Sequence, residues 1–148
     1  MASGAYSRGV LKTLDGTIDL DTAVLKLELL KSSYAYDPDH ASLSSLTEIT
    51  GVSGYTGGFG GSGRKTATIT LTEQTANNRV VVIIGDKTWT ALGTGDTIGG
   101  CALVFETGGS DANSVPLFFF DFTDIPTNGS DVTIDFDGTN GNVQYNIV

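Results

Sequence analysis

The 148-residue chain contains very little of what catalytic and metal sites usually require. It has one cysteine, Cys101, and one histidine, His40. A single cysteine excludes an intramolecular disulfide and a zinc site built from several thiolates, and a single histidine excludes a centre held by several imidazoles. Eight Lys and Arg stand against 17 Asp and Glu, and the resulting net charge of -9 argues against a nucleic-acid partner. We therefore expect no catalytic residues, no cofactor and no metal centre.

Long apolar runs are also missing. Residues 1–15 lack the apolar core of roughly 7–15 residues that a signal peptide contains. The longest apolar run, Val80 to Ile84, is far shorter than the roughly 18 residues of a membrane span. The unpaired Cys101 fits a reducing compartment. We expect a chain that is made in the cytoplasm and has no membrane partner.

Short alternating segments dominate what is present. In residues 65–72, Ala67, Ile69 and Leu71 alternate with threonine, a pattern typical of a strand with one exposed face. Turns rich in Gly, Asn and Asp separate this run from further candidate strands at 79–84, 87–92, 102–106, 115–122, 131–137 and 143–147. Residues 23–31 also alternate, with Leu25, Leu27 and Leu29 on one side. About eight strands predict an all-β fold, an antiparallel β-sandwich or jelly-roll-like domain.

The domain organisation follows from the exceptions to this pattern. Residues 1–15 are expected to form an N-terminal arm or helix, because Tyr6, Val10 and Leu14 are four residues apart. Residues 16–148 form the single β-sandwich domain. A long irregular insertion, 34–63, interrupts it with a short capped helix near Leu43, followed by a stretch with seven Gly among thirteen residues.

Four aromatic residues lie in this insertion, and two interpretations of them stay open. They either pin the insertion to the core or form a contact surface for a protein or a sugar. The residues are Tyr34, Tyr36, Tyr55 and Phe59.

Several chemical motifs are matched only in part. Gly58 to Gly63 fits GxGxxG, but a strand follows it where a dinucleotide site needs a helix. Arg64 stands where a phosphate-binding loop needs lysine. Residues 135–142 have the wrong glycine position for an EF-hand, which favours a turn and leaves other calcium binding open. His40 has nearby serines but no nucleophile elbow around them. We expect that the chain is not an enzyme.

Charge is unevenly distributed along the chain. Residues 1–79 carry seven bases and eight acids, whereas residues 80–148 carry Lys87 and nine acids. The simplest interpretation is that the acidic residues of 80–148 lie in solvent-exposed turns. The alternative is an acidic half that faces solvent and a near-neutral half that docks on a partner.

In order along the chain, several segments resemble small virion proteins of tailed bacteriophages and cyanophages. They are Gly16 to Thr22 leading into Leu25 to Tyr34, then Asp37 to His40 with Ser45 to Gly58, and finally Lys87 to Trp89, Gly100 to Phe105 and Val115 to Leu117. Residues 63–84 depart from the family pattern.

The resemblance implies a virion structural protein located on the capsid surface. A β-sandwich of this size would act as a capsid cement or decoration protein that binds the outer surface of the major capsid protein shell and stabilises it, as a dimer or trimer with itself. The candidate interface residues are Tyr6, Val10, Leu11, Tyr34, Tyr36, Tyr55 and Phe59. Two alternatives are a tail or fibre module that binds a host receptor or glycan, and a free lectin-like or calcium-binding domain.

Overall fold

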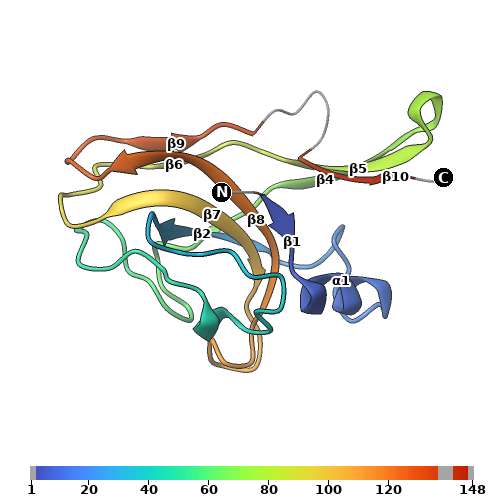
Figure 1. Ribbon diagram of the computed structural model, residues 1–148, viewed down its shortest axis with the longest axis horizontal. Helices are drawn as coiled ribbons and strands as arrows, with labels where there is room; N and C mark the ends of the chain where they lie inside the picture. Colours follow the sequence, from blue (N-terminus) through green and yellow to red (C-terminus); the bar gives the residue numbers. More distant parts are fainter. Residues whose placement is uncertain (1–2, 137–141, 147–148) are drawn as a thin grey trace.

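The computed structural model describes residues 3–136 and 142–146, and most of its regular structure is antiparallel β-sheet. The larger sheet has the strand order β1-β8-β7-β2-β3 (Figure 1). Its strands are β1 (Gly4–Ala5), β8 (Val115–Pro126), β7 (Thr97–Phe105), β2 (Lys26–Lys31) and β3 (Lys65–Thr66). The predicted all-β, sandwich-like antiparallel fold is confirmed.

A second layer covers one face of this sheet. It consists of a three-stranded sheet in the order β10-β5-β4 and a two-stranded sheet of β6 and β9. The strands are β4 (Ile69–Gln74), β5 (Arg79–Ile84), β6 (Lys87–Trp89), β9 (Val132–Ile134) and β10 (Val143–Asn146). Side chains continue the ladder where the strands break, since Ile84 N donates to Asn142 Oδ1 at 2.6 Å and Phe136 N donates to Asp86 Oδ1 at 2.8 Å.

The main core lies between the two layers. From the larger sheet it takes the alternate residues Leu25, Leu27 and Leu29, and from the second layer Val82 and Trp89, all of them buried. Each of these side chains contributes about 1.5–3 kcal/mol by leaving water. The predicted inward face of residues 23–31 is therefore confirmed.

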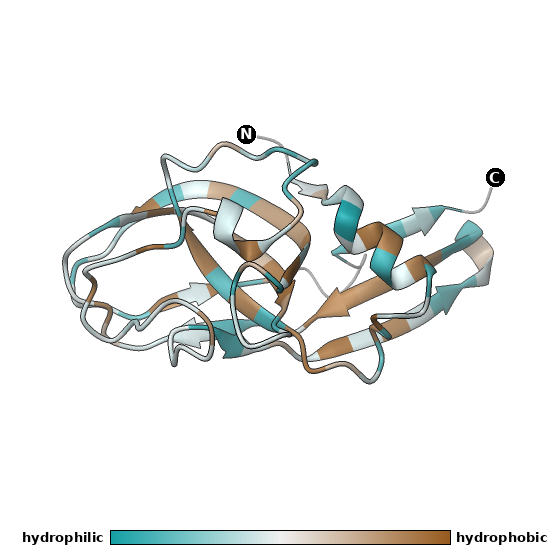
Figure 2. Ribbon diagram, turned by 90° about the horizontal axis from the view of Figure 1, so that it is seen from below, coloured by the Kyte–Doolittle hydropathy of each residue, from teal (hydrophilic) through white to brown (hydrophobic). Residues whose placement is uncertain are grey.

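The opposite face of the larger sheet is also covered, which the sequence did not suggest. A second core cluster there contains Tyr6, Leu30, Tyr34, Leu43 and Phe119. The helix α1 (Ser7–Leu14) and the irregular residues after β2, which include the 3₁₀ turn η1 (Leu43–Ser45), lie over the larger sheet on the side nearest the viewer in Figure 2. The first part of the 34–63 insertion, from Tyr34 to Leu46, therefore builds a third layer over the larger sheet, whereas Ile49, Val52 and Tyr55 join the main core.

The N-terminal segment is part of this packing. Tyr6 is fully buried and its N–H donates to Leu117 O at 3.0 Å. Gly9 lies so close to β8 that an added Cβ would come within 2.7 Å of Leu117 Cα. The helix predicted around Tyr6 to Leu14 is confirmed as α1, and the segment is attached to the larger sheet by β1 and by Tyr6, which belongs to the second core.

Two predicted elements need correction. The run 65–72 is split, because β3 pairs with β2 in the larger sheet while β4 pairs with β5 in the other layer. The helix predicted near Leu43 is only the turn η1, and the 3₁₀ turn η2 (Thr75–Asn77) joins β4 to β5. The described residues contain ten strands, including two of only two residues. A register shift between β7 and β8 falls at Gly99.

Candidate functional site

The most concentrated group of charges in the described residues surrounds the buried side chain of Arg64, which is 5% exposed. Arg64 follows the Gly-rich segment 51–63 and precedes β3. Four carboxylates converge on it from separate parts of the chain. They are Glu28 in β2, Glu48 in the insertion, Glu106 after β7, and Asp111 in the β7–β8 connection; we call these four residues and Arg64 the Arg64 cluster.

The guanidinium makes two forked pairs. Its Nε and Nη2 donate to the two oxygens of Glu48 at 3.0 and 2.7 Å. Its Nη1 and Nη2 donate to the two oxygens of Asp111 at 2.6 and 3.1 Å, and Nη1 also reaches Glu106 at 3.0 Å. A planar donor group with five N–H bonds suits this bidentate arrangement. Arg64 is thereby fully committed to carboxylates of its own chain.

Glu28 differs from the other acids of the cluster. Its side chain is fully buried, and Oε2 lies 2.8 Å from Arg64 Nε, but that N–H is directed at Glu48. Neither Glu28 oxygen has a hydrogen bond to the described residues. Burial raises the pKa of Glu28 well above its usual value, Arg64 opposes this, and the neighbouring carboxylates add to it. Burial therefore favours the protonated form of Glu28, although Arg64 lies beside it.

Glu106 shows the opposite behaviour. Burial favours its neutral form, but hydrogen bonds from Lys26, Arg64 and the Gly60 amide outweigh burial and lower its pKa. Lys26 Nζ donates to Glu106 Oε2. Lys26 and Arg64 thus both lie against Glu106 and stabilise its ionised form.

The cluster also holds the Gly-rich segment 51–63. Gly58 N donates to Glu48 at 2.8 Å and Gly60 N donates to Glu106 at 3.2 Å. Tyr55 OH donates to Glu48 at 2.7 Å and accepts the Leu29 N–H at 3.1 Å. Side chains thus replace the backbone ladder that this segment lacks. These donors and acceptors are paired with one another, so their hydrogen bonds hold the segment in place; we call this set of hydrogen bonds the clamp.

The described residues contain no group of three or more His, Cys, Asp or Glu arranged to hold a metal ion. The turn at 135–142, for which calcium binding was left open, has residues 137–141 outside the described part of the chain. Tyr34 OH lies 2.9 Å from His40 Nδ1, whereas Ser42 Oγ lies 2.8 Å from Ser44 Oγ. The one histidine is therefore hydrogen-bonded to a buried tyrosine.

The structure divides the seven predicted interface residues. Tyr6, Tyr34 and Tyr55 are 0%, 3% and 7% exposed, so these three cannot form an exposed surface, and that part of the prediction is wrong. They pin the insertion and the N-terminal segment to the core, which was the alternative interpretation. Tyr36 is half-buried, stacks on Phe119 with ring centroids 5.5 Å apart and donates to Ala5 O.

The remaining three predicted residues are at the surface. Phe59 is 43% exposed in the Gly-rich segment, Leu11 is 53% exposed in α1, and Val10 is half-buried. Leu14, which the prediction omitted, is 77% exposed. Leu11 and Leu14 are three residues apart and therefore neighbours on one helix face. We call Val10, Leu11 and Leu14 the α1 surface.

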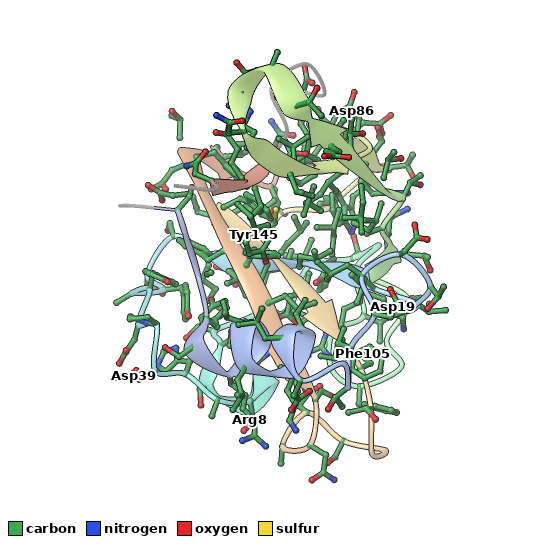
Figure 3. All side chains as sticks on the ribbon, turned by 90° about the vertical axis from the view of Figure 1, so that its right-hand side faces the viewer. Arg8, Asp19, Asp39, Asp86, Phe105 and Tyr145 are labelled. Atoms are coloured by element: carbon green, nitrogen blue, oxygen red, sulfur yellow. The ribbon has the colours of Figure 1, made fainter. Side chains whose placement is uncertain are left out.

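The α1 surface is also the basic part of an acidic chain. The helix carries Arg8 and Lys12 and no acidic residue, and Arg8 projects away from the body of the molecule (Figure 3). Lys12 is paired with Asp15 at 3.2 Å just beyond the helix. A basic helix face with exposed leucines is a combination that suits contact with another protein.

The charge asymmetry between the two halves of the sequence is partly removed by the fold. Three acids of the second half, Asp96, Glu106 and Asp111, form ion pairs with bases of the first half. Lys31 pairs with Asp96 at 2.9 Å. The interpretation of a separate acidic half facing solvent is therefore wrong for these three residues.

Sequence patterns did not indicate the Arg64 cluster, because its members are far apart along the chain. Arg64 is 16 residues from Glu48 and 47 from Asp111. One sequence feature could have indicated the cluster, namely the arginine that directly follows the Gly-rich segment.

Comparison of the chain with protein-family models, with curated proteins and with solved structures finds no match in any of the three. The resemblance to phage virion proteins therefore stays a prediction. Within the described ranges, no helix is both long enough and apolar enough to cross a membrane.

Proposed function

We propose that the chain is a virion structural protein of a tailed phage, a capsid cement or decoration protein that binds the outer surface of the major capsid protein shell. The observation that carries the proposal is the α1 surface, where Leu11 and Leu14 are exposed beside Arg8 and Lys12. A protein that stabilises a shell acts by adding interface area. The resemblance along the chain supplies the identity of the partner.

The way in which α1 is fixed to the larger sheet supports this role. The helix that presents Leu11 and Leu14 is fixed to β8 by buried Tyr6 and by the close approach of Gly9. A rigidly held interface loses little conformational entropy when it binds. The Arg64 cluster similarly fixes the long insertion against the same sheet. The proposed binding surface is therefore preformed.

The test begins with purified particles of a phage whose lysate contains the chain. Mass spectrometry of DNA-filled heads measures the number of copies per particle, and cement requires hundreds of copies. A few copies per particle would instead identify the tail or fibre module, and absence from purified particles would contradict both functions.

The surface itself is tested by rebinding of the purified chain to heads stripped of it. We expect Leu11→Lys and Leu14→Lys each to weaken rebinding by about tenfold or more, because each places a charge in an apolar contact. Val24→Lys is the matched control, since Val24 is 65% exposed and lies outside α1. Equal rebinding of all three variants would contradict the assignment of this surface. Deleting residues 1–15 is a poorer test, because it also removes buried Tyr6.

A further inference from the structure

The strand β4 is an open edge of the second layer. The order β10-β5-β4 places it outermost, and β5 is its only ladder partner among residues 3–136 and 142–146. In Figure 3 the hairpin of β4 and β5 stands at the top of the molecule, beyond α1.

The hydrogen-bonding direction along β4 can be read from its neighbours. Ile84 N donates to Asn142 on the β10 side, so the facing pair Ile69 and Ile84 does not exchange hydrogen bonds. Gly85 N donates to Thr68 O, as expected beside such a pair. Because hydrogen bonding alternates along an antiparallel strand, Ile69, Leu71 and Glu73 direct their N–H and C=O groups to the free edge.

Natural edge strands are usually protected by charge, proline, a bulge or short length. The other edges of this molecule follow that rule by length, since β1 and β3 have two residues, β9 three and β10 four. By contrast, β4 has six residues, pairs with β5 in unbroken register, and contains neither lysine nor proline. Its one charged residue is Glu73.

The edge also exposes an apolar side chain. Leu71 lies in the middle of β4, is 39% exposed, and borders a hollow of about 350 Å³ that Thr13, Ile18 and Leu20 also line. Leu71 is thus both the midpoint of the unprotected backbone and its most apolar accessible point.

We propose that β4 pairs with β4 of a second copy of this chain, antiparallel, around a two-fold axis at Leu71. In this register Leu71 faces Leu71, each Ile69 faces Glu73 and each Thr70 faces Thr72 of the other copy. The register suits a second copy of the strand, because leucine faces leucine at the axis, threonine faces threonine, and each Glu73 carboxylate faces Ile69 and not the other Glu73. The two three-stranded sheets become one continuous six-stranded sheet.

The pairing buries only one strand edge and the side chains beside it. This is small compared with the roughly 800 Å² per partner of a stable interface. The dimer is therefore expected to form in a concentration-dependent equilibrium. The proposal concerns the chain alone and holds whether or not the chain binds a capsid shell.

A cysteine at the axis provides the sharpest test. Residues facing each other in a hydrogen-bonded antiparallel pair have Cα atoms about 5.5 Å apart, within the range that a disulfide spans. We expect Leu71→Cys to form a covalent dimer under mild oxidation. The native Cys101 is fully buried and does not interfere. Val24→Cys is the control, because Val24 is more exposed than Leu71, at 65% against 39%, and lies outside β4; equal crosslinking of the two variants would overturn the proposal.

Sedimentation velocity over a range of concentrations provides the second measurement. We expect the native chain to approach twice its monomer mass at high concentration, and Leu71→Lys to raise the dimer dissociation constant by about tenfold or more, because two lysines then face each other. Val24→Lys should behave as the native chain. A native chain that stays monomeric, or a dimer that Leu71→Lys leaves intact, would overturn the proposal, and circular dichroism establishes that each variant is folded.

Discussion

The Gly-rich segment 51–63 and the hairpin of β4 and β5 differ in two respects. One is the regularity of their backbone hydrogen bonding, and the other is how firmly they are attached to the rest of the molecule. The segment has almost no ladder hydrogen bonds, yet Glu48 and Glu106 hold it through side-chain hydrogen bonds to Tyr55, Gly58 and Gly60. The hairpin has a regular six-residue register, yet one edge and part of one face are open to solvent. Regular backbone and stable attachment are therefore separate properties here, because the first depends on neighbouring strands and the second on burial.

The largest effect is expected where the clamp is removed. Arg64→Met would leave Glu48, Glu106 and Asp111 charged and without their common partner, which should lower the free energy of unfolding by about 3–5 kcal/mol. Urea denaturation measures this loss. Arg79→Met is the control in the hairpin, because the hydrogen bonds of the Arg79 side chain within the described residues go to the neutral side chains of Gln74 and Gln144. Similar losses for the two variants would contradict the contrast between the regions.

A smaller effect is expected from a single hydroxyl of the clamp. Tyr55→Phe keeps the buried ring and removes the oxygen that joins the Leu29 amide to Glu48. The unfolding free energy should fall by about 1–3 kcal/mol, since a buried donor loses its partner. Hydrogen exchange should also quicken at the Gly58 amide, while exchange in β5 stays unchanged. Unchanged exchange at Gly58 would show that the segment is held without this bridge.

The smallest loss of unfolding free energy at acidic pH is expected for Glu28→Gln, because glutamine resembles the protonated form that burial favours at Glu28. The pKa of Glu28 is raised in the folded state, so the folded chain keeps a proton that the unfolded chain releases. The native unfolding free energy therefore falls as pH rises above the unfolded value of 4.5 towards the raised one. The variant lacks this loss, so its advantage over the native chain should grow with pH.

Thermal melts of both proteins between pH 5 and pH 8 check this result. Glu48→Gln is the matched control, because its carboxylate is hydrogen-bonded to Arg64, Tyr55 and Gly58 and its loss should destabilise the fold throughout that range. A Glu28→Gln variant that is destabilised at pH 5 would indicate that Glu28 is ionised in the fold.

Much of the β-architecture could be predicted from local patterns. The alternation of Leu25, Leu27 and Leu29 correctly indicated a strand with one face in the core. The same alternation placed Glu28 outward, and this was wrong because Tyr6, Tyr34 and Leu43 cover that face from distant parts of the chain. A period of two identifies the faces of a strand but cannot tell that both are buried.

The split of residues 65–72 has a related cause. The alternation continues through Ala67, although β3 pairs with β2 and β4 pairs with β5. Ala67 N donates to Leu25 O at 2.8 Å, the last contact before the chain changes sheets. The alternation of side chains along a strand does not show which neighbouring strand supplies its hydrogen bonds. A change of pairing strand therefore cannot be predicted from that alternation. The Arg64 cluster was hidden similarly, because its contacts are long-range.

The pairing of β1 with β8 has a consequence for the order in which the chain matures on the ribosome. Gly4 lies opposite Phe119, and Tyr6 contributes to the second core beside the same strand. Residues 3–15 are synthesised before β8, yet they have no docking site on it until more than a hundred further residues have been translated. These residues therefore find their place late, and α1, with its exposed leucines, stays an unattached amphipathic peptide until β8 has emerged.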